Sequence, residues 1–386
     1  MNAKNSLQNV IIFCEILLNK AIAFTTIKIK QKPAVLIIKA DVIGDYIVFR
    51  NYLSSFKQSA LYKDSAITLL ANVMLKDLAL ALDSDVVDEF LWVDYKKYSH
   101  YGYKRRFFSN IAKRKFDEVI VFHYSRTLFT DITAFAANAK RKTAMSNDFS
   151  WISPQTRKFT DKFYSRLIFI PETYTHEFKK NGFFAEQITG ITADFIDKLP
   201  YIRIPTQHTQ IAEFNLPFTY VVISSGAGEA KRKLPYSKLL LLIKQLLHQG
   251  YSLCFTGTPS DSMFVEEVIA KFPSFFARII NLTGKTTLPQ LLYVVTGAKL
   301  VVCNESSLYH ISIALQKPVI CFSGGGHYKR WAVYGEVKNT VVVFEPMPCF
   351  NCDWNCIYTI KDGYSYPCIQ SIHDSSVINA ITHLQV

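Results

Sequence analysis

Short, continuous apolar runs alternate with helix-like patterns along two stretches of this sequence. The first series lies at 34–40, 66–73, 88–94 and 116–124 and opens with "AVLIIKA". The second opens with "FTYVVISSGAG" (218–228) and closes with "NTVVVF". Strands that are apolar on both faces and separated by helices are typical of parallel sheets covered on both sides. The sequence therefore predicts an α/β fold with two Rossmann-like domains, which suits a length of 386 residues.

The predicted domain boundaries follow changes in this pattern. They are a helical extension over 1–32, a first Rossmann-like domain over 33–205, a second over 206–345, a cysteine-rich loop over 346–370 and a C-terminal helix over 371–386. A helix with a basic end is expected over 128–142, and a loop, a helix and a linker between 150 and 205. Residues 10–24 form an amphipathic helix that lies on a membrane or, as we expect, packs on the body of the protein.

The chain is basic, since 44 Lys and Arg against 31 Asp and Glu give a net charge of +13. This excess indicates a polyanionic partner such as nucleic acid, an anionic membrane face or a phosphorylated substrate, or simply a basic surface. The N-terminal segment lacks the pattern of a signal peptide, and no long uninterrupted apolar window occurs. We therefore expect a cytoplasmic protein, peripheral at the inner face of the cytoplasmic membrane, whose cysteines stay reduced or bind metal.

Three strand ends in the second half collect small and polar residues. They are Ser224 and Ser225, followed by Lys231, Arg232 and Lys233; Thr256 and Gly257; and Glu305, Ser306 and Ser307. Backbone N–H groups, hydroxyls and a helix N-terminus suit a phosphate or diphosphate, and the cations would neutralise it. Neither a Walker sequence nor G-x-G-x-x-G opens a helix, which argues against NTPase and dinucleotide-binding sites.

The first strand ends in "KADVIGDY", which places Lys39, Asp41, Gly44 and Asp45 at its tip. Gly44 permits a tight turn, and Asp41 is expected to cap the following helix. Asp45 is then left for another role. A carboxylate at a strand tip facing a cleft between domains can act as a general base.

Four segments of the chain resemble glycosyltransferase family 9, the bacterial heptosyltransferases of lipopolysaccharide core assembly and their relatives. They are "VLIIKADVIGDYIVF", "FDEVIVFHYSRT", "NLTGKTTLPQLLYVVTGAKLVVCNESSLYHISIAL" and "KPVICFSG", in this order, and the resemblance covers roughly residues 33 to 380. It implies a GT-B fold, in which two Rossmann-like domains face each other across a cleft. The nucleotide-sugar would bind the C-terminal domain and the acceptor the N-terminal one, with inverting, metal-independent transfer.

The resemblance also implies roles for individual residues. The family's catalytic aspartate falls on Asp45, and its nearby lysine, on the acceptor side, falls on Lys39. The donor-binding serine pair falls on Ser224 and Ser225, with Thr256 and Gly257 nearby. The phosphate-contacting lysine corresponds to Arg232, with Lys231 and Lys233 as alternatives, and Leu234 stands where the family has tryptophan.

The family motif Asp-Thr-Gly-x-x-His falls on Glu305, Ser306, Ser307 and His310, with Leu308 between them. Glu305 lengthens the arm that should hold the sugar, and Ser307 adds a side chain where the backbone approaches phosphate. The donor is therefore ADP-heptose or another nucleotide-sugar. His310 either contacts the donor or packs against the sheet.

Basic residues alternate with aromatic ones over 96–115, a segment that includes Lys104, Arg105 and Arg106. In a GT-B acceptor domain they would meet phosphates of a lipid-linked glycan or membrane head groups. Single-stranded nucleic-acid binding and a solvated basic helix are the alternatives. We expect acceptor contacts here and no nucleic acid, with Arg126 and His176 as looser matches to acceptor-side positions.

Four cysteines, Cys349, Cys352, Cys356 and Cys368, fall in the spacing C-x2-C-x3-C-x11-C. Four thiolates in a short loop suit tetrahedral Zn or Fe, so we predict a structural metal clip, with a reduced thiol cluster as the alternative. No cofactor is expected for catalysis.

The sequence thus predicts an inverting, metal-independent glycosyltransferase that moves a heptose or related sugar from a nucleotide-sugar to lipopolysaccharide core or another envelope glycan. The acceptor would be phosphorylated or lipid-linked. A non-catalytic basic binding protein with a GT-B fold and an epimerase-like nucleotide-sugar enzyme are the alternatives.

Overall fold

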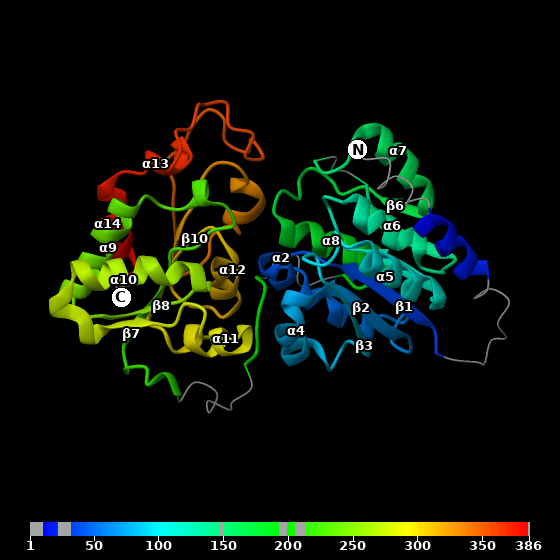
Figure 1. Ribbon diagram of the computed structural model, residues 1–386, viewed down its shortest axis with the longest axis horizontal. Coiled ribbons are helices and arrows are strands. Elements are labelled where there is room, and N and C mark those ends of the chain that lie inside the picture. Colours follow the sequence, from blue (N-terminus) through cyan, green and yellow to red (C-terminus); the bar gives the residue numbers. More distant parts are fainter. Residues whose placement is uncertain are drawn as a thin grey trace. The chain divides into compact units, whose positions relative to one another are not determined.

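The structure, a computed structural model, describes residues 11–21, 32–146, 148, 150–192, 199–204 and 213–384. These residues form two compact units (Figure 1). The described residues of the first unit fall within 1–174 and 178–197, and those of the second within 175–177 and 198–386.

Each unit is built on a six-stranded parallel sheet. The first has the order β3-β2-β1-β4-β5-β6 and the second β12-β11-β10-β7-β8-β9. The strands are β1 (Ala34–Lys39), β2 (Ala66–Asn72), β3 (Glu89–Val93), β4 (Glu118–Val121), β5 (Arg141–Met145), β6 (Arg166–Ile168), β7 (Tyr220–Ser224), β8 (Ser252–Phe255), β9 (Ile279–Asn281), β10 (Leu300–Asn304), β11 (Val319–Phe322) and β12 (Thr340–Val343). The predicted pair of Rossmann-like α/β units is confirmed.

The strand order reverses once in each sheet. In the first unit β1 pairs with β4, so that Ile38 lies opposite Val121, and in the second β7 pairs with β10, so that Ser224 lies opposite Cys303. The chain leaves the two strands of each pair toward opposite sides of the sheet. Their carboxyl ends therefore border a crevice in which α/β proteins of this kind bind ligands.

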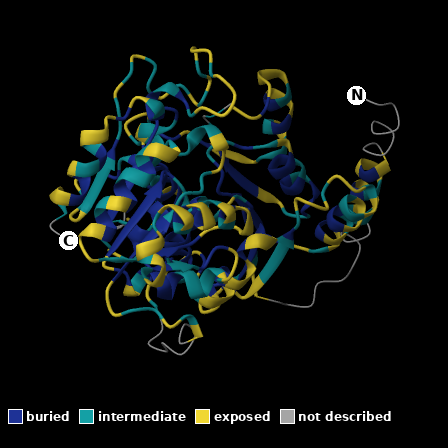
Figure 2. Cartoon of the chain, turned by 60° about the vertical axis from the view of Figure 1, so that its left-hand side comes forward, coloured by how far each residue is buried: buried dark blue, intermediate teal, exposed yellow. Residues whose placement is uncertain are grey.

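Helices lie between the strands of both units and after the last one (Figure 1). They are α2 (Ile43–Ile47), α3 (Leu53–Gln58), α4 (Lys76–Asp83), α5 (Tyr101–Lys113), α6 (Leu128–Ala136), α7 (Pro154–Thr160), α8 (Glu177–Thr189), α9 (Tyr236–His248), α10 (Ser262–Lys271), α11 (Leu288–Gly297), α12 (Ser307–Ala314), α13 (Pro367–Gln370) and α14 (Asp374–His383). Strands β4 and β10 are buried along their whole length, and Figure 2 shows buried segments in dark blue among exposed ones in yellow. Apolar side chains on both faces of these central strands explain the uninterrupted apolar runs in the sequence.

Residues 11–21 form a helix that packs on the first unit. Ile12 and Ile16 are buried in that unit's core, and the ring of Phe13 stacks on Phe135 with their centroids 5.2 Å apart. The Glu15 carboxylate pairs with Arg105 of α5 at 2.6 Å. Packing on the body, as expected, is thus the arrangement of this segment. Among the residues described, no helix combines the length and apolarity that crossing a membrane requires.

Two strands lie where none was predicted. The helix expected over 128–142 ends at Ala136, since Ala137 adopts an extended conformation, and the basic residues Arg141 and Lys142 begin β5 instead. Strand β6 falls in the stretch expected to hold a loop, a helix and a linker. Both strands open with polar residues and β6 is partly exposed, so neither shows the apolar run that identifies a central strand.

A buried ion pair ties α4 to the chain segment after α2. The Arg50 guanidinium donates to both oxygens of Asp83, at 3.0 and 2.8 Å, and the Tyr46 hydroxyl donates to the same carboxylate at 2.6 Å. Burial raises the pKa of Asp83, and Arg50 opposes that shift. Each charge therefore depends on its partner for compensation.

We predict that Asp83→Ala lowers the free energy of unfolding of the first unit by about 3–5 kcal/mol, because it leaves a buried guanidinium without its carboxylate. Lys57→Ala is the control, since it breaks a more exposed pair with Asp88 and should cost less than about 1 kcal/mol. Urea unfolding measures both variants. Equal losses in the two would contradict the role of the buried pair.

Candidate functional site

The loop after β7 and the turn after β10 lie at the carboxyl edge of the second sheet. Asn304, the last residue of β10, holds these two segments together. Its side-chain amide donates to the Ser225 carbonyl at 2.9 Å, and its side-chain oxygen accepts from the Leu234 N–H at 2.9 Å. The loop that carries Ser224, Ser225 and Arg232 is thereby fixed beside Glu305.

Arg232 and Glu305 form an ion pair at this edge. Arg232 lies in a short 3-10 turn, Ala230–Arg232, and donates to Oε2 of Glu305 at 2.7 Å and to its carbonyl at 3.3 Å. The side chains are 20% and 9% exposed. Burial raises the pKa of Glu305, and Arg232 opposes that shift. One cation and one carboxylate therefore stand together in a sheltered position, next to the end of the sheet.

Lys233 is tied to a neighbouring turn through Asp261. Its ammonium lies 3.3 Å from Oδ1 of Asp261, whose other oxygen accepts from the N–H and the hydroxyl of Thr258 at 2.9 and 2.7 Å. Gly257 has a φ of +154°, and a Cβ there would lie 2.8 Å from Asp261. Glycine is therefore needed for this turn. Thr256 is buried and Gly257 exposed.

Ser306, Ser307 and Leu308 begin α12. Ser306 is the N-cap without a side-chain capping bond, Ser307 is the first helical residue, and both are half-buried. Leu308 is buried. The first turn of a helix has N–H groups that no helical carbonyl can accept from, and such groups suit an anion. This turn follows Glu305 directly in the chain.

His310 packs inside the second unit. Its Nδ1 lies 2.7 Å from the Tyr334 hydroxyl, and its ring contacts those of Tyr309, Trp331 and Tyr334. Burial lowers the pKa of His310 to about 3, and His176 and Arg232 act in the same direction. The imidazole is therefore neutral at ordinary pH. Of the two interpretations of this histidine, packing against the sheet is the one that this arrangement favours.

Lys39, Asp41 and His123 meet at the carboxyl ends of β1 and β4 in the first unit. The Lys39 ammonium lies 2.6 Å from one Asp41 oxygen, and Nδ1 of His123 lies 3.1 Å from the other. The Ala40 N–H donates to Nε2 of His123 at 3.1 Å, so Nδ1 carries the proton and donates to Asp41. Burial favours a higher pKa for Asp41, but His123 and Lys39 together hold that pKa well below its usual value.

The expected capping role of Asp41 is wrong. Val42 is the N-cap of α2, and no side chain caps this helix. Asp41 is instead held by Lys39, which is 1% exposed, and by His123, and is itself 27% exposed. Asp45 lies in the first turn of α2 and is half-buried. The tip of β1 thus carries two carboxylates, of which Asp41 is fixed by a lysine and a histidine.

The predicted acceptor residues are not gathered in one place. Lys104 and Arg105 of α5 are engaged locally, Lys104 lying 5.0 Å from the centre of the Tyr98 ring and Arg105 pairing with Glu15. Arg106 is exposed. Arg126 is 0% exposed and contacts Asp161 and the face of Tyr164. This arrangement gives no support to the prediction that Arg126 binds an acceptor, because the guanidinium is enclosed by its own unit.

The four cysteines of the cysteine-rich loop carry free thiols, and Cys368 is buried. The Gly325 N–H donates to the Cys368 sulfur at 3.3 Å. Burial raises the pKa of Cys352 and of Cys368, so both favour the neutral thiol. In the part of the chain that the structure describes, no three His, Cys, Asp or Glu side chains are arranged to hold a metal ion. This arrangement does not support the predicted Zn or Fe clip at Cys349, Cys352, Cys356 and Cys368.

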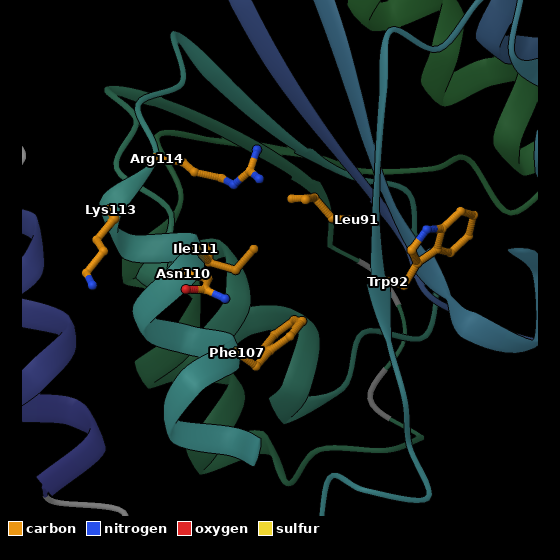
Figure 3. Close-up of a pocket in the computed structure, with 7 residues that line it drawn as sticks. All are labelled: Leu91, Trp92, Phe107, Asn110, Ile111, Lys113 and Arg114. Carbon is orange, nitrogen blue, oxygen red and sulfur yellow. The ribbon is translucent and has the colours of Figure 1, made fainter. Parts of the chain in front are cut away.

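A cavity of about 530 Å³ lies in the first unit between β3 and α5. Its lining residues are Leu91, Trp92, Phe107, Asn110, Ile111, Lys113 and Arg114 (Figure 3). Leu91 points toward α5, whereas Trp92 lies on the other side of its strand. Arg114 is paired with Glu89 at 2.6 Å. Lys113 and Arg114 belong to the basic segment 96–115, whereas none of the residues predicted for catalysis or donor binding lines this cavity.

Sequence reasoning missed several residues that shape these two edges. His123 follows the apolar run of β4, and Asn304 ends that of β10, so a search for polar residues at every strand tip would have found both. Asp261 gave a weaker signal, as the carboxylate in "TGTPSD". Trp354 lies in the cysteine-rich loop, for which the sequence predicted a role for the cysteines and none for the tryptophan.

A comparison with protein families gives a match to the model described as "Glycosyltransferase family 9 (heptosyltransferase)" over residues 105–356. Among curated proteins, lipopolysaccharide heptosyltransferase 2 of Salmonella typhimurium is 34% identical over 98 residues. That segment is 25% of this chain and spans only 28% of the length of the relative. The family match begins after β1, so it leaves Asp45 outside.

Two solved structures resemble the chain over most of its length. E. coli ADP-heptose lipopolysaccharide heptosyltransferase II matches with a TM-score of 0.68 and 16% identity, covering 91% of this chain and 98% of that one. A glycosyl transferase of family 9 from Veillonella parvula matches with a TM-score of 0.68 and 20% identity, covering 91% and 97%. The likeness confirms the predicted GT-B fold.

The buried His310 predicts a pH dependence of stability. An unfolded histidine titrates near pH 6.5, whereas the folded pKa is about 3. As the pH falls from 6.5 toward 3, the unfolded chain takes up a proton that the folded protein does not, so the free energy of unfolding decreases. The decrease from this site approaches about 1.4 kcal/mol per pH unit.

His310→Gln removes this proton uptake, so its unfolding free energy should fall less steeply than that of the wild type over the same range. His327, whose pKa burial lowers to about 4, contributes to both proteins and cancels in the difference. Urea unfolding at several pH values measures the two slopes. Parallel slopes would contradict a neutral buried His310.

Proposed function

Since this chain belongs to glycosyltransferase family 9, we propose that it transfers a sugar from a nucleotide-sugar donor to an envelope glycan. The observation that carries the proposal is the Arg232–Glu305 pair at the reversal of strand order in the second unit. A nucleotide-sugar presents an anionic diphosphate next to a sugar rich in hydroxyls. A guanidinium and a carboxylate side by side are complementary to those two parts.

On the donor side, catalysis consists of stabilising the leaving nucleoside diphosphate. One nitrogen of the Arg232 guanidinium donates to the Glu305 carboxylate. The other N–H groups of a guanidinium can donate to phosphate oxygens. Lys233 and the first-turn amides of α12 add positive potential at the same edge. Charge that develops on the diphosphate as the glycosidic bond breaks is thus met by groups already in place.

On the acceptor side, we assign Asp45 as the general base. It would accept the proton of the acceptor hydroxyl while that oxygen attacks the anomeric carbon from the face opposite the leaving group, which inverts the configuration. Lys39 and His123 hold Asp41 as a carboxylate at the same strand tip. Because the pKa of Asp41 is depressed, Asp41 is a weaker base than an ordinary aspartate. It is therefore suited to accepting hydrogen bonds from acceptor hydroxyls rather than to removing their protons.

The donor sugar we propose is heptose or a related sugar, carried by ADP or another nucleoside diphosphate. The support comes from the family and from relatives that are named heptosyltransferases. The acceptor would be lipopolysaccharide core or another phosphorylated or lipid-linked glycan, reached at the inner face of the cytoplasmic membrane. Exposed Arg106 on the basic helix α5 is suited to meet its phosphates.

Asp45→Asn should reduce transfer by about 10²–10⁴-fold, because the amide cannot accept the proton. Donor binding should be unchanged, since Asp45 lies in the other unit from Arg232. Initial rates at saturating substrates measure the effect. Asp64→Asn is the matched control, as an exposed aspartate that precedes β2, and it should retain full activity. Near-normal transfer by Asp45→Asn would remove it as the base.

A screen of ADP-, GDP- and UDP-sugars should identify the donor by thermal stabilisation, which is about 2.7 kcal/mol when a ligand is present at 100 times its Kd. Glu305→Gln should weaken binding of that donor.

Acceptor-dependent release of nucleoside diphosphate distinguishes transfer from the alternatives. A binding protein would be stabilised without release, and an epimerase would convert the sugar without an acceptor. Stabilisation by no nucleotide-sugar would overturn the proposal.

A further inference from the structure

The loop between β12 and α13 packs back onto the carboxyl edge of the second sheet. The Asn351 N–H donates to the Gly325 carbonyl at 2.6 Å, and the Asp353 N–H donates to the Gly326 carbonyl at 3.0 Å. A Cβ on Gly326 would overlap the ring of Trp354, so the glycines after β11 are what allow the loop to approach. Trp354 is thereby brought to the edge that carries the Arg232–Glu305 pair.

The indole of Trp354 is fixed on three sides. Its N–H donates to Nδ1 of His327 at 3.2 Å, and the Tyr366 ring lies 4.9 Å away. The guanidinium carbon of Arg232 lies 4.5 Å from the ring centre. Trp354 also has a φ of +60°, an uncommon conformation for a tryptophan. The loop thus holds the ring in a defined place next to a cation.

The same loop contacts the residues on both sides of Arg232. The Tyr366 N–H donates to the Lys231 carbonyl at 2.8 Å, and the Ser365 hydroxyl donates to the Lys233 carbonyl at 2.6 Å. The backbone is therefore bonded to the loop on either side of the residue whose guanidinium lies over the Trp354 ring. The loop thus contacts three consecutive residues, Lys231, Arg232 and Lys233, through two hydrogen bonds and one ring contact. Such directed contacts indicate more than the filling of space.

We propose that Trp354 is a positioning residue of the diphosphate site: its ring holds the Arg232 guanidinium between Glu305 and the bound donor. The inference rests on the proposed function of Arg232. An arginine side chain has many rotamers, and a pairing with Glu305 alone leaves the guanidinium free to turn about that carboxylate. Stacking on an indole fixes the plane of the guanidinium, so its remaining N–H groups keep one direction.

The alternative is that Trp354 only fills space, since it is half-buried and packs against the core of the second unit. The two roles differ in which ligand they affect. A packing defect weakens every contact of the site, including those to the nucleoside. Loss of Arg232 positioning weakens only contacts to phosphate.

The test compares Trp354→Leu, which removes the ring, with Trp354→Phe, which keeps one. Calorimetry measures the Kd of whichever of ADP, GDP or UDP binds the wild type, and the Kd of the matching nucleoside. Trp354→Leu should weaken diphosphate binding by about 3- to 30-fold, the range of a cation–π contact, and leave nucleoside binding unchanged. Trp354→Phe should restore most of the loss. The donor KM should rise in the same order.

Arg232→Lys supplies a second measurement, because an ammonium keeps the charge but not the planar stack. Combined with Trp354→Leu it should cost less than the sum of the single changes, since both remove one contact. Tyr364→Leu, an exposed aromatic of the same loop, is the control and should bind diphosphate like the wild type. If Trp354→Leu does not fold, Trp354→Met takes its place.

Equal weakening of diphosphate and nucleoside by Trp354→Leu, or additive costs in the double variant, would overturn the positioning role. So would unchanged diphosphate binding by that variant. In each of these cases the wild type still binds and transfers, so the proposed function stands. A wild type that binds none of the three diphosphates and transfers no sugar would instead overturn the proposed function, and the positioning role with it.

Discussion

The pairing of strands that are distant in sequence brings together the charged groups at the carboxyl edge of each sheet. In each sheet the chain adds strands to one side, returns to the middle and continues on the other side, so β1 lies next to β4 and β7 next to β10. The segments that leave each pair diverge and open a crevice at the carboxyl ends. His123 comes to Asp41 because β4 pairs with β1, and Glu305 comes to Arg232 because β10 pairs with β7.

These polar groups remain at the strand ends because each has a partner there. A charge next to a buried sheet loses solvation, which costs several kcal/mol unless another group compensates it. Lys39 is compensated by Asp41, and Glu305 by Arg232. Asn304 satisfies two backbone groups of the loop that carries Arg232. The interactions that hold these side chains in place are thus the same ones that offset the desolvation cost of their charges.

The sequence was sufficient to predict the central strands and several of the polar residues that follow them. The apolar runs of β4 and β10 mark strands buried along their whole length, and polar residues directly after such strands lie at the carboxyl edge of a parallel sheet. Strands β5 and β6 could not be predicted in this way, because they open with polar residues and lie toward one side of the sheet. Local pattern does not distinguish such strands from a helix end or a loop.

Pairings between distant residues escaped prediction for a different reason. Asp41 precedes a helix and carries the ordinary signal of a cap, so only the position of β4 reveals that it bonds to His123. Arg126 follows β4 in the chain, but Asp161 and Tyr164, which come after α7, lie against its buried guanidinium. Trp354 is separated from Arg232 by several strands and helices, and their contact follows from how the loop folds back.

How that loop is held bears on what its cysteines do. Backbone hydrogen bonds to Gly325, Gly326 and Lys231 anchor both of its ends, and the rings of Trp354 and Tyr366 pack between them. Cys368 takes part as a buried acceptor for the Gly325 N–H, a role that a neutral thiol can fill. The position of the tryptophan therefore follows from backbone pairing and aromatic packing. The closely spaced cysteines lie on a segment held by those contacts, so a change in the thiols would reach Arg232 through Trp354 or through the hydrogen bonds of Ser365 and Tyr366 to its neighbours in the chain.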